Sequence, residues 1–218
     1  MMFRRNGHSR RPFGILDIGS TKICCMIGEH DKLGGVRLLG QGTHASAGIR
    51  AGEVTALADL SDAIGNAVQT AERAAGVSLT AVSVVLAGGS PRSSFSKQSM
   101  TMADSTVSRR DVRRLLDRSG HQPMDDALQL MQFHPLHYSL DDIRGIADPV
   151  GMRGRELAVE FLTVAAKRTH LANIIEALAQ NHLGAERFIH AGYAAGLACL
   201  GTEEREVGST VIDLGGGT

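Results

Sequence analysis

A short polar turn near the N-terminus carries the residue types that bind phosphate. Two apolar, β-rich runs flank Gly19-Ser20-Thr21-Lys22, which is the pattern of a hairpin. Glycine allows close backbone approach, Ser20 and Thr21 offer amide and hydroxyl donors, and Lys22 adds positive charge. Asp17 precedes the turn, and an acid beside a phosphate requires a divalent cation between them, typically magnesium that keeps several waters. An exposed hairpin turn without a ligand is the alternative for this stretch taken alone.

The same pattern recurs at the C-terminal end of the sequence. There, Asp213 stands within an apolar run and is followed by Gly215-Gly216-Gly217-Thr218. When the two stretches are superposed, Asp17 coincides with Asp213 and Gly19 with Gly215. The recurrence predicts two related halves that face one nucleotide.

These paired hairpins resemble the first and second phosphate loops of the actin, Hsp70 and sugar-kinase superfamily. Within it, the chain most resembles the FtsA family of bacterial cell-division proteins. Four passages carry the resemblance in that family's order: Leu16 to Lys22, Val84 to Gly89, Asp148 to Met152 and Val207 to Thr218. The resemblance covers nearly the whole chain but only the N-terminal half of such a protein, so we expect a truncated form.

The resemblance implies an α/β fold, namely a ribonuclease-H-like lobe of an actin-type ATPase with a small inserted α/β subdomain. The second lobe is expected to be truncated after its first strand. The expected order is a disordered basic tail (1–12), the first part of the core (13–88), the insert (89–166), the second part of the core (167–207), and the first strand and phosphate loop of the second lobe (208–218).

The resemblance also implies that the ligands are ATP and Mg²⁺. Asp17 and Asp213 would hold the magnesium, mostly through water. The residues expected to clasp the β- and γ-phosphates are Gly19, Ser20, Thr21, Lys22, Gly215, Gly216, Gly217 and Thr218.

Fast hydrolysis needs a group that orients the attacking water. Actin-like ATPases often place a Gln or Glu at the start of the helix before the second loop, and here Ala191 aligns with that position. His190 is the only polar alternative, in a shifted register. We therefore expect ATP to be a structural or switching ligand, with at most weak ATPase activity.

By resemblance, the function is that of an ATP-binding adaptor of the bacterial division ring. It would link FtsZ to the inner face of the cytoplasmic membrane at the septum and recruit later division proteins. The FtsZ-binding region and the C-terminal membrane helix are expected to lie beyond Thr218, whereas the insert would serve self-association and the later proteins. The alternatives are another actin-superfamily protein, either a pilus-assembly or segregation ATPase or a small-metabolite kinase.

Composition is that of an ordinary soluble globular chain, with 43% hydrophobic and 21% charged residues. The net charge is zero and only 4% of residues are aromatic, which argues against nucleic acid as a partner. Cys24, Cys25 and Cys199 are too few for a disulfide framework, in keeping with a reducing, cytoplasmic compartment. His134 and His137 lack a third ligand, so metal binding there is disfavoured.

Hydrophobic periodicity and capping residues predict the elements that position the two loops. Thr55 is predicted to cap a helix that runs to about Ala75 and ends at Gly76, and Thr169 to cap another that runs to His182. The almost wholly apolar stretch 82–87 predicts a strand buried on both faces, and a last strand is predicted over 208–214.

The basic segment that follows Ser108 predicts a helix of the insert. Ser108 and Asp111 have the spacing of a capping box. The arginines at 109, 110, 113 and 114 are interpreted as the solvated face of this amphipathic helix, with a protein-partner surface as the next reading.

Overall fold

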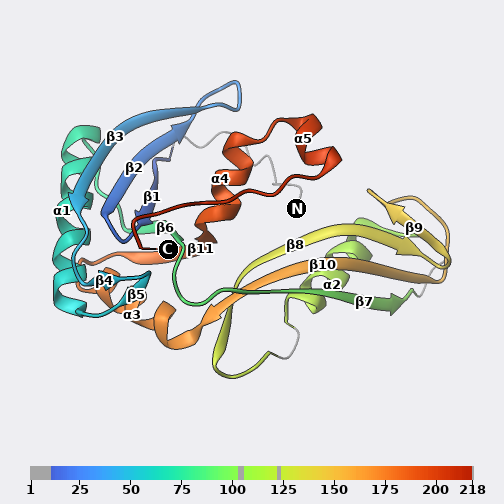
Figure 1. The fold of residues 1–218 in the computed structure, drawn as a ribbon. Helices are drawn as coiled ribbons and strands as arrows, with labels where there is room; N and C mark the ends of the chain where they lie inside the picture. The colour runs from blue at the N-terminus through green and yellow to red at the C-terminus, as the bar shows by residue number, and fades with distance from the viewer. Residues whose placement is uncertain (1–10, 103–105, 122–123, 218) are drawn as a thin grey trace. The chain divides into compact units, whose positions relative to one another are not determined.

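The computed structural model describes residues 11–102, 106–121 and 124–217 (Figure 1). The chain divides into two compact units: the insert, made of Arg92–Ala165, and the core, made of the residues up to Pro91 and from Ala166 onward. The basic tail predicted over 1–12 lies, except for its last two residues, outside the described residues, as does Thr218.

The core unit is built on a five-stranded sheet of the described residues with the strand order β11-β6-β1-β2-β3. The antiparallel part is formed by β1 (Phe13–Ile18), β2 (Lys22–His30) and β3 (Val36–Ala45). The strands β6 (Ala81–Leu86) and β11 (Gly184–His190) run parallel to β1. The carboxyl ends of β1, β6 and β11 therefore meet at one edge of the sheet, which is where α/β sheets bind ligands.

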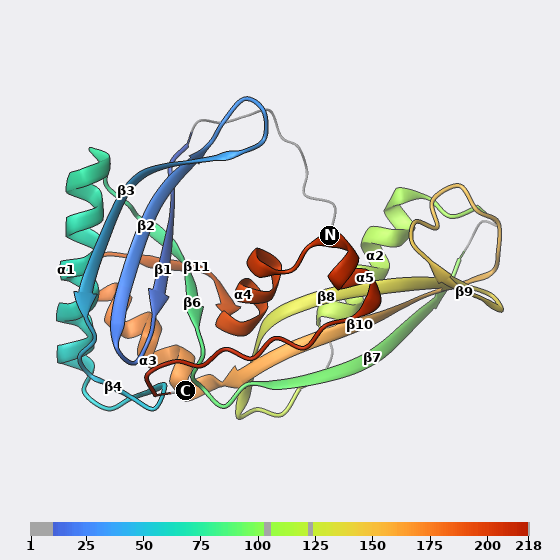
Figure 2. The ribbon, with the colours of Figure 1, turned by 45° about the horizontal axis from the view of Figure 1, so that its top comes forward.

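Helices cover the two faces of this sheet unequally. The helix α1 (Leu57–Ala75) packs against β2 and β3, and α3 (Arg168–Ala179) packs against α1 and β11. Figure 2 shows both helices on one face and α4 (Ala191–Cys199), which packs against β6 and β11, on the other. No residue of α4 is buried. The face that carries α4 is therefore the more open one.

Burial along the strands follows this difference. In β1 and β6, every second residue is buried and the residues between are only half-buried. The prediction that 82–87 is buried on both faces is therefore wrong, because only α1 and α3 form a continuous cover. Asp17 lies in register with Val85 and Cys24, on the open face, whereas its neighbour Leu16 is fully buried.

Two glycines of β3 allow α1 to lie directly on the sheet. A Cβ atom built on Gly42 would collide with the backbone oxygen of Ala67, and one on Gly40 would lie 2.5 Å from the backbone oxygen of Ala71. Since Gly42 is opposite Cys25, this also identifies the face of the sheet that α1 covers. Glycine at these positions is a packing requirement rather than a turn signal.

The predicted helix ends are partly confirmed. Helix α1 ends at Gly76, which has φ 70° and donates its amide to Glu72, as predicted. Its N-cap is Ala56 rather than Thr55. Helix α3 begins at Arg168 and ends at Ala179, so Thr169 is not its cap. A strand runs directly into α3, which leaves no free capping residue between them.

The insert consists of a four-stranded sheet of the described residues and one helix. Its strands are β7 (Arg92–Thr101), β8 (Leu128–Leu140), β9 (Ile143–Ile146) and β10 (Glu156–Lys167), in the order β7-β10-β8-β9. The helix α2 (Arg109–Gly120) packs beside β7. Its core contains Met100, Met102, Val107, Leu115, Leu140, Leu157, Val159 and Phe161.

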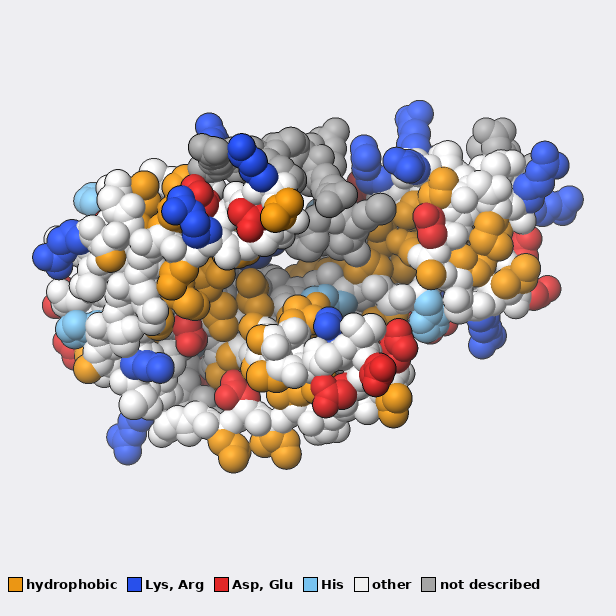
Figure 3. Space-filling model, turned by 90° about the horizontal axis from the view of Figure 1, so that it is seen from above, with side chains coloured by type: hydrophobic (Ala, Val, Ile, Leu, Met, Phe, Trp, Pro, Cys, Tyr) orange, Lys and Arg blue, Asp and Glu red, His pale blue; other side chains and the backbone are white. Residues whose placement is uncertain are grey.

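The predicted cap and faces of α2 are confirmed. The Ser108 hydroxyl accepts from the Asp111 amide, and the Asp111 carboxylate accepts from the Ser108 amide at 2.9 Å. Leu115 is fully buried, while the arginines at 109, 110, 113 and 114 are exposed. The basic run is thus the solvated face of an amphipathic helix. On the face shown in Figure 3, both basic and acidic side chains are exposed.

The core unit also contains two very short strands, one short helix and an irregular segment where a strand was predicted. The two-stranded ribbon of β4 (Ile49–Arg50) and β5 (Glu53–Val54) and the short helix α5 (Thr202–Val207) were not predicted from the sequence. The strand predicted at 208–214 is wrong, because residues 208–217 have no regular secondary structure. A strand needs a hydrogen-bonded neighbour, and no described strand pairs with this segment. Among the described residues, no helix has the length and apolar character needed to cross a membrane.

Candidate phosphate-binding site

The first candidate loop is the tight turn between β1 and β2. The Gly19 amide donates to the Lys22 carbonyl oxygen at 3.1 Å, which closes the turn. A Cβ atom on Gly19 would lie 3.1 Å from the same oxygen, so a side chain there would crowd the turn. Ser20 is half-buried, and Thr21 and Lys22 are exposed. The donors predicted from the sequence are therefore accessible at the edge of the sheet where the carboxyl ends of the parallel strands meet.

Asp17 lies in β1, two residues before Gly19, and the pKa of its carboxyl group is shifted. Burial raises the pKa of its carboxyl group, Lys22 lowers this pKa, and Asp213 raises it. Burial has the largest effect. A half-buried carboxylate whose ionisation is disfavoured in this way gains from a nearby cation.

The second candidate loop lies against the first. A Cβ atom on Gly216 would collide with the Thr21 hydroxyl, and one on Gly217 would lie 2.8 Å from the Ser20 hydroxyl oxygen. Asp213 is near enough to Asp17 to affect its pKa. Gly216 and Gly217 thus permit a close approach that larger residues would prevent. The structure brings the turn after Asp17 and the glycines after Asp213 together here, as the repeated pattern predicts.

Two predicted residues of the second loop add little. Gly215 is exposed and lies between Asp213 and Gly216 in the same irregular segment. Thr218 lies outside the described residues. The part of the second loop that approaches the first is therefore Gly216 with Gly217.

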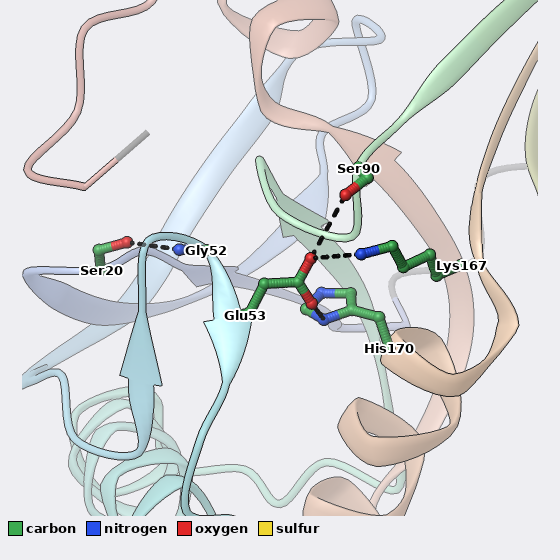
Figure 4. Close-up of polar contacts among 6 residues, drawn as sticks. All are labelled: Ser20, Gly52, Glu53, Ser90, Lys167 and His170. Carbon is green, nitrogen blue, oxygen red and sulfur yellow. Dashed lines mark hydrogen bonds and ion pairs between the residues drawn. The ribbon is translucent and has the colours of Figure 1, made fainter.

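Sequence reasoning missed the third side of this site, which is the β4–β5 ribbon. The Gly52 amide donates to the Ser20 hydroxyl oxygen at 3.2 Å (Figure 4). Gly217 also approaches this ribbon, since a Cβ atom there would lie 3.4 Å from the Cα of Ala51. The only sequence signal was the glycine at 52, which by itself indicates a turn but not what the turn contacts.

The residues next to α4 define what the site lacks. β11 ends at His190, which is in register with Leu86 of β6, and Leu86 is in register with Ile18 of β1. Ala191 is the first residue of α4. Its methyl group cannot orient a water molecule, so the structure gives no support to rapid hydrolysis through this position.

The residues of the two loops fit the phosphate end of a magnesium nucleotide. Ser46, whose amide donates to the Thr21 carbonyl at 3.0 Å, has a buried hydroxyl with no hydrogen-bond partner in the described part of the chain. Within that part, no group of three or more His, Cys, Asp or Glu residues is placed to hold a metal. A magnesium ion held by Asp17 and Asp213 would take waters and phosphate oxygens as its other ligands.

A separate hollow of about 440 Å³ lies along α1 and does not belong to this site. Its lining includes Asp62, Glu72 and Asn181, and none of the loop residues. Two acidic side chains and no basic side chain line this hollow, so its charge disfavours a phosphate.

The fold is of the actin-like type, with an inserted α/β subdomain. A solved structure of a PilM–PilN type IV pilus biogenesis complex superposes with a TM-score of 0.53 and 15% identity, covering 88% of this chain and 50% of that one, which shows the fold alone. Residues 88–165 match the family model described as the SHS2 domain inserted in FtsA.

Sequence relatives give the particular family. The chain is 36% identical over 214 residues to the cell division protein FtsA of Agrobacterium fabrum, covering 94% of this chain and 48% of that protein. It is 27% identical over 203 residues to the FtsA of Escherichia coli K12, and the match covers 93% of this chain and 48% of that protein. The chain belongs to the FtsA family. It spans about half the length of the curated relatives it matches.

Proposed function

We propose that this chain binds ATP with Mg²⁺ between its two glycine loops. The observation that carries the proposal is the meeting of the loops, with Gly216 against Thr21 and Asp213 near Asp17. This meeting occurs at the carboxyl edge of three parallel strands, where such sheets bind ligands. Neither loop would serve this purpose alone, since each supplies one carboxylate and one set of donors.

In this proposal the carboxylates, the hydroxyls and the glycines have separate roles. Bound magnesium would neutralise charge between the phosphates and the two carboxylates. Lys22 and the hydroxyls of Ser20 and Thr21 donate to phosphate oxygens, and the glycines 215–217 let a second set of amides approach from the other side. Since Ala191 holds no water, we propose that ATP acts as a switching ligand whose differential affinity shifts the populations of two conformations.

We further propose that the whole protein works in bacterial cell division as an actin-like adaptor. This proposal is supported by the sequence identity of the chain to proteins named cell division protein FtsA. It is also supported by the match of residues 88–165 to the SHS2 domain inserted in FtsA. In this proposal the protein links FtsZ to the cytoplasmic face of the membrane at the septum. The insert serves self-association and recruits later division proteins.

Two other readings use the same fold. The pilus-assembly or segregation reading has the likeness to the PilM–PilN structure in its favour, but 15% identity supports the fold and no shared partner. A small-metabolite kinase would need a catalytic acid beside the loops besides the two carboxylates assigned to magnesium. The FtsA reading is preferred because its support comes from sequence as well as fold.

Isothermal titration calorimetry with Mg-ATP tests the nucleotide proposal. We expect Asp17→Ala and Lys22→Ala to weaken binding at least tenfold, because each removes a charge that faces the phosphates or their cation. Lys32→Ala is the matched control, since Lys32 is an exposed lysine in the distant β2–β3 turn. Unchanged binding in both site variants would remove the nucleotide from this site.

The adaptor proposal is tested separately. The complete gene product, immobilised with Mg-ATP, is expected to retain purified FtsZ, whereas a PilN-type partner is not. Retention of the pilus partner instead of FtsZ would reverse the choice between the two readings.

A further inference from the structure

The ribbon that contacts the first phosphate loop is too small to be stable by itself. β4 and β5 have two residues each, and Arg50 pairs with Glu53 across the two-residue turn Ala51-Gly52. Both turn residues have positive φ, 48° and 72°, as a type I′ turn requires. An isolated two-stranded hairpin is marginal in water, and Ala51 adds the strain of a left-handed conformation. Something outside the ribbon must hold it in place.

Its position is fixed on one side by close backbone contact. A Cβ atom on Gly88 would collide with the carbonyl oxygen of Gly52, so the ribbon rests directly on the segment after β6. The amide of the same Gly52 donates to the Ser20 hydroxyl oxygen at 3.2 Å. A displacement of this ribbon would therefore change the hydrogen bonding of Ser20, which is one of the residues predicted to bind phosphate.

On the other side, the ribbon is held by the carboxylate of Glu53. The Ser90 hydroxyl and the Lys167 ammonium lie 3.5 Å and 3.4 Å from its Oε1. The Nδ1 of His170 lies 3.3 Å from its Oε2. Figure 4 shows these three side chains converging on Glu53 from the β6 end, the β10 end and α3.

The three partners do not contribute equally. Lys167 and Glu53 are 51% and 41% exposed, so solvent screens their attraction. The side chain of His170 is only 2% exposed. Burial lowers the pKa of His170 most, Glu53 raises this pKa and Lys167 lowers it. The lowered pKa favours a neutral imidazole, which packs against the Glu53 carboxylate from a fixed, buried position, although its Nδ1 has no hydrogen-bond partner among the described residues.

We infer that Glu53 is a positioning residue for the phosphate-binding turn: bound by Ser90 and Lys167 and packed against the buried His170, it holds the β4–β5 ribbon so that the Gly52 amide fixes the Ser20 hydroxyl. This inference rests on the proposed nucleotide site. It goes beyond that site because Glu53 is not one of the residues expected to bind the phosphates or the magnesium. Ser90 and Lys167 stand next to the two points where the chain enters and leaves the insert, so the same carboxylate also gathers both of these segments.

Substitutions of Glu53 test this inference in the 218-residue chain. Glu53→Ala removes the anchor, and we expect faster hydrogen exchange of the amides of Gly52 and of 19–22, together with about tenfold weaker Mg-ATP binding. Glu53→Gln keeps an acceptor for Ser90 and Lys167, and a neutral imidazole can change tautomer to accept from its amide, so it is expected to restore both properties. Glu186→Ala is the control, since Glu186 is an exposed glutamate that meets a single serine hydroxyl at 3.5 Å.

A double-mutant cycle separates positioning from general support. If Glu53 acts through Ser20, then Ser20→Ala and Glu53→Ala will be non-additive in Mg-ATP affinity, because the second change removes what the first has already lost. Additive losses, or exchange rates at 19–22 that Glu53→Ala leaves unchanged, would overturn the inference. If the unmodified chain fails to bind Mg-ATP, the proposed function fails, and the exchange rates alone decide whether the anchor exists.

Discussion

Asp17 and Asp213 stand near opposite ends of the described chain, yet the carboxylate of Asp213 helps to raise the pKa of Asp17. The larger cause of the raised pKa is the burial of Asp17 on the open face of the sheet, and Lys22 opposes it. The two acids occupy the same position in two copies of one sequence pattern. Their proximity joins that pattern to a single place in the fold.

The raised pKa of Asp17 predicts how stability depends on pH. In the folded state this carboxyl group holds its proton above the ordinary pKa of 3.8, so its contribution favours folding most below pH 3.8 and declines as pH rises through the raised pKa. Asp17→Asn cannot ionise, so we expect its urea midpoint relative to wild type to rise across that window and then stay constant. Midpoints measured from pH 3.5 to 7 check this. A difference that is flat throughout would show that Asp17 titrates normally.

The contact of α1 with β3 predicts opposite effects for two glycine substitutions. Gly42→Ala places a methyl group against the backbone oxygen of Ala67, and we expect a loss of about 1–3 kcal/mol in the free energy of unfolding. Gly120→Ala, at the end of α2, meets nothing within 4 Å and is expected to gain about 0.5 kcal/mol through helix propensity. Equilibrium denaturation of both variants measures the contrast. Equal effects would mean that α1 does not rest on the backbone of β3.

The capping box of α2 predicts both a stability loss and a pH dependence. Ser108→Ala removes the acceptor for the Asp111 amide and should cost about 1 kcal/mol. Hydrogen bonds from the Ser108 side chain and backbone lower the pKa of Asp111. Its contribution is therefore complete above the ordinary pKa of 3.8 and is lost as pH falls through the lowered pKa. NMR titration of Asp111 in the wild type and in Ser108→Ala checks the coupling: the pKa should rise in the variant.

The turn of the β4–β5 ribbon offers a stabilising substitution. Ala51 has φ 48°, a left-handed conformation that costs an alanine about 1 kcal/mol. Ala51→Asn creates the Asn-Gly sequence that type I′ turns prefer, and we expect a gain of about 0.5–1 kcal/mol. The matched change Gly52→Ala should destabilise, since it adds a second residue with a side chain in the left-handed conformation, at φ 72°. Thermal unfolding of the pair decides: a loss in Ala51→Asn would place the turn in another class.

Local signals were reliable where a short stretch of chain sets the structure. The hairpin around Gly19, the end of α1 at Gly76 and the Ser108 capping box depend on residues only a few positions apart. The resemblance to the FtsA family was readable for the same reason, because its motifs are short runs. The predicted caps Thr55 and Thr169 were wrong where an incoming strand or ribbon, rather than the residue type, decided where the helix begins.

The sequence alone determined the two acid-and-glycine motifs, their order and the types of donor they carry, because these are properties of contiguous residues. Only the tertiary structure decided that β1 and β6 are fully buried on one face only and that residues 208–217 form no strand. It also decided that the ribbon containing Gly52 and Glu53 contacts Ser20. Burial and hydrogen-bond pairing depend on which distant segments pack together. No local pattern encodes that choice, so Glu53 and His170 became visible only once the chain was folded.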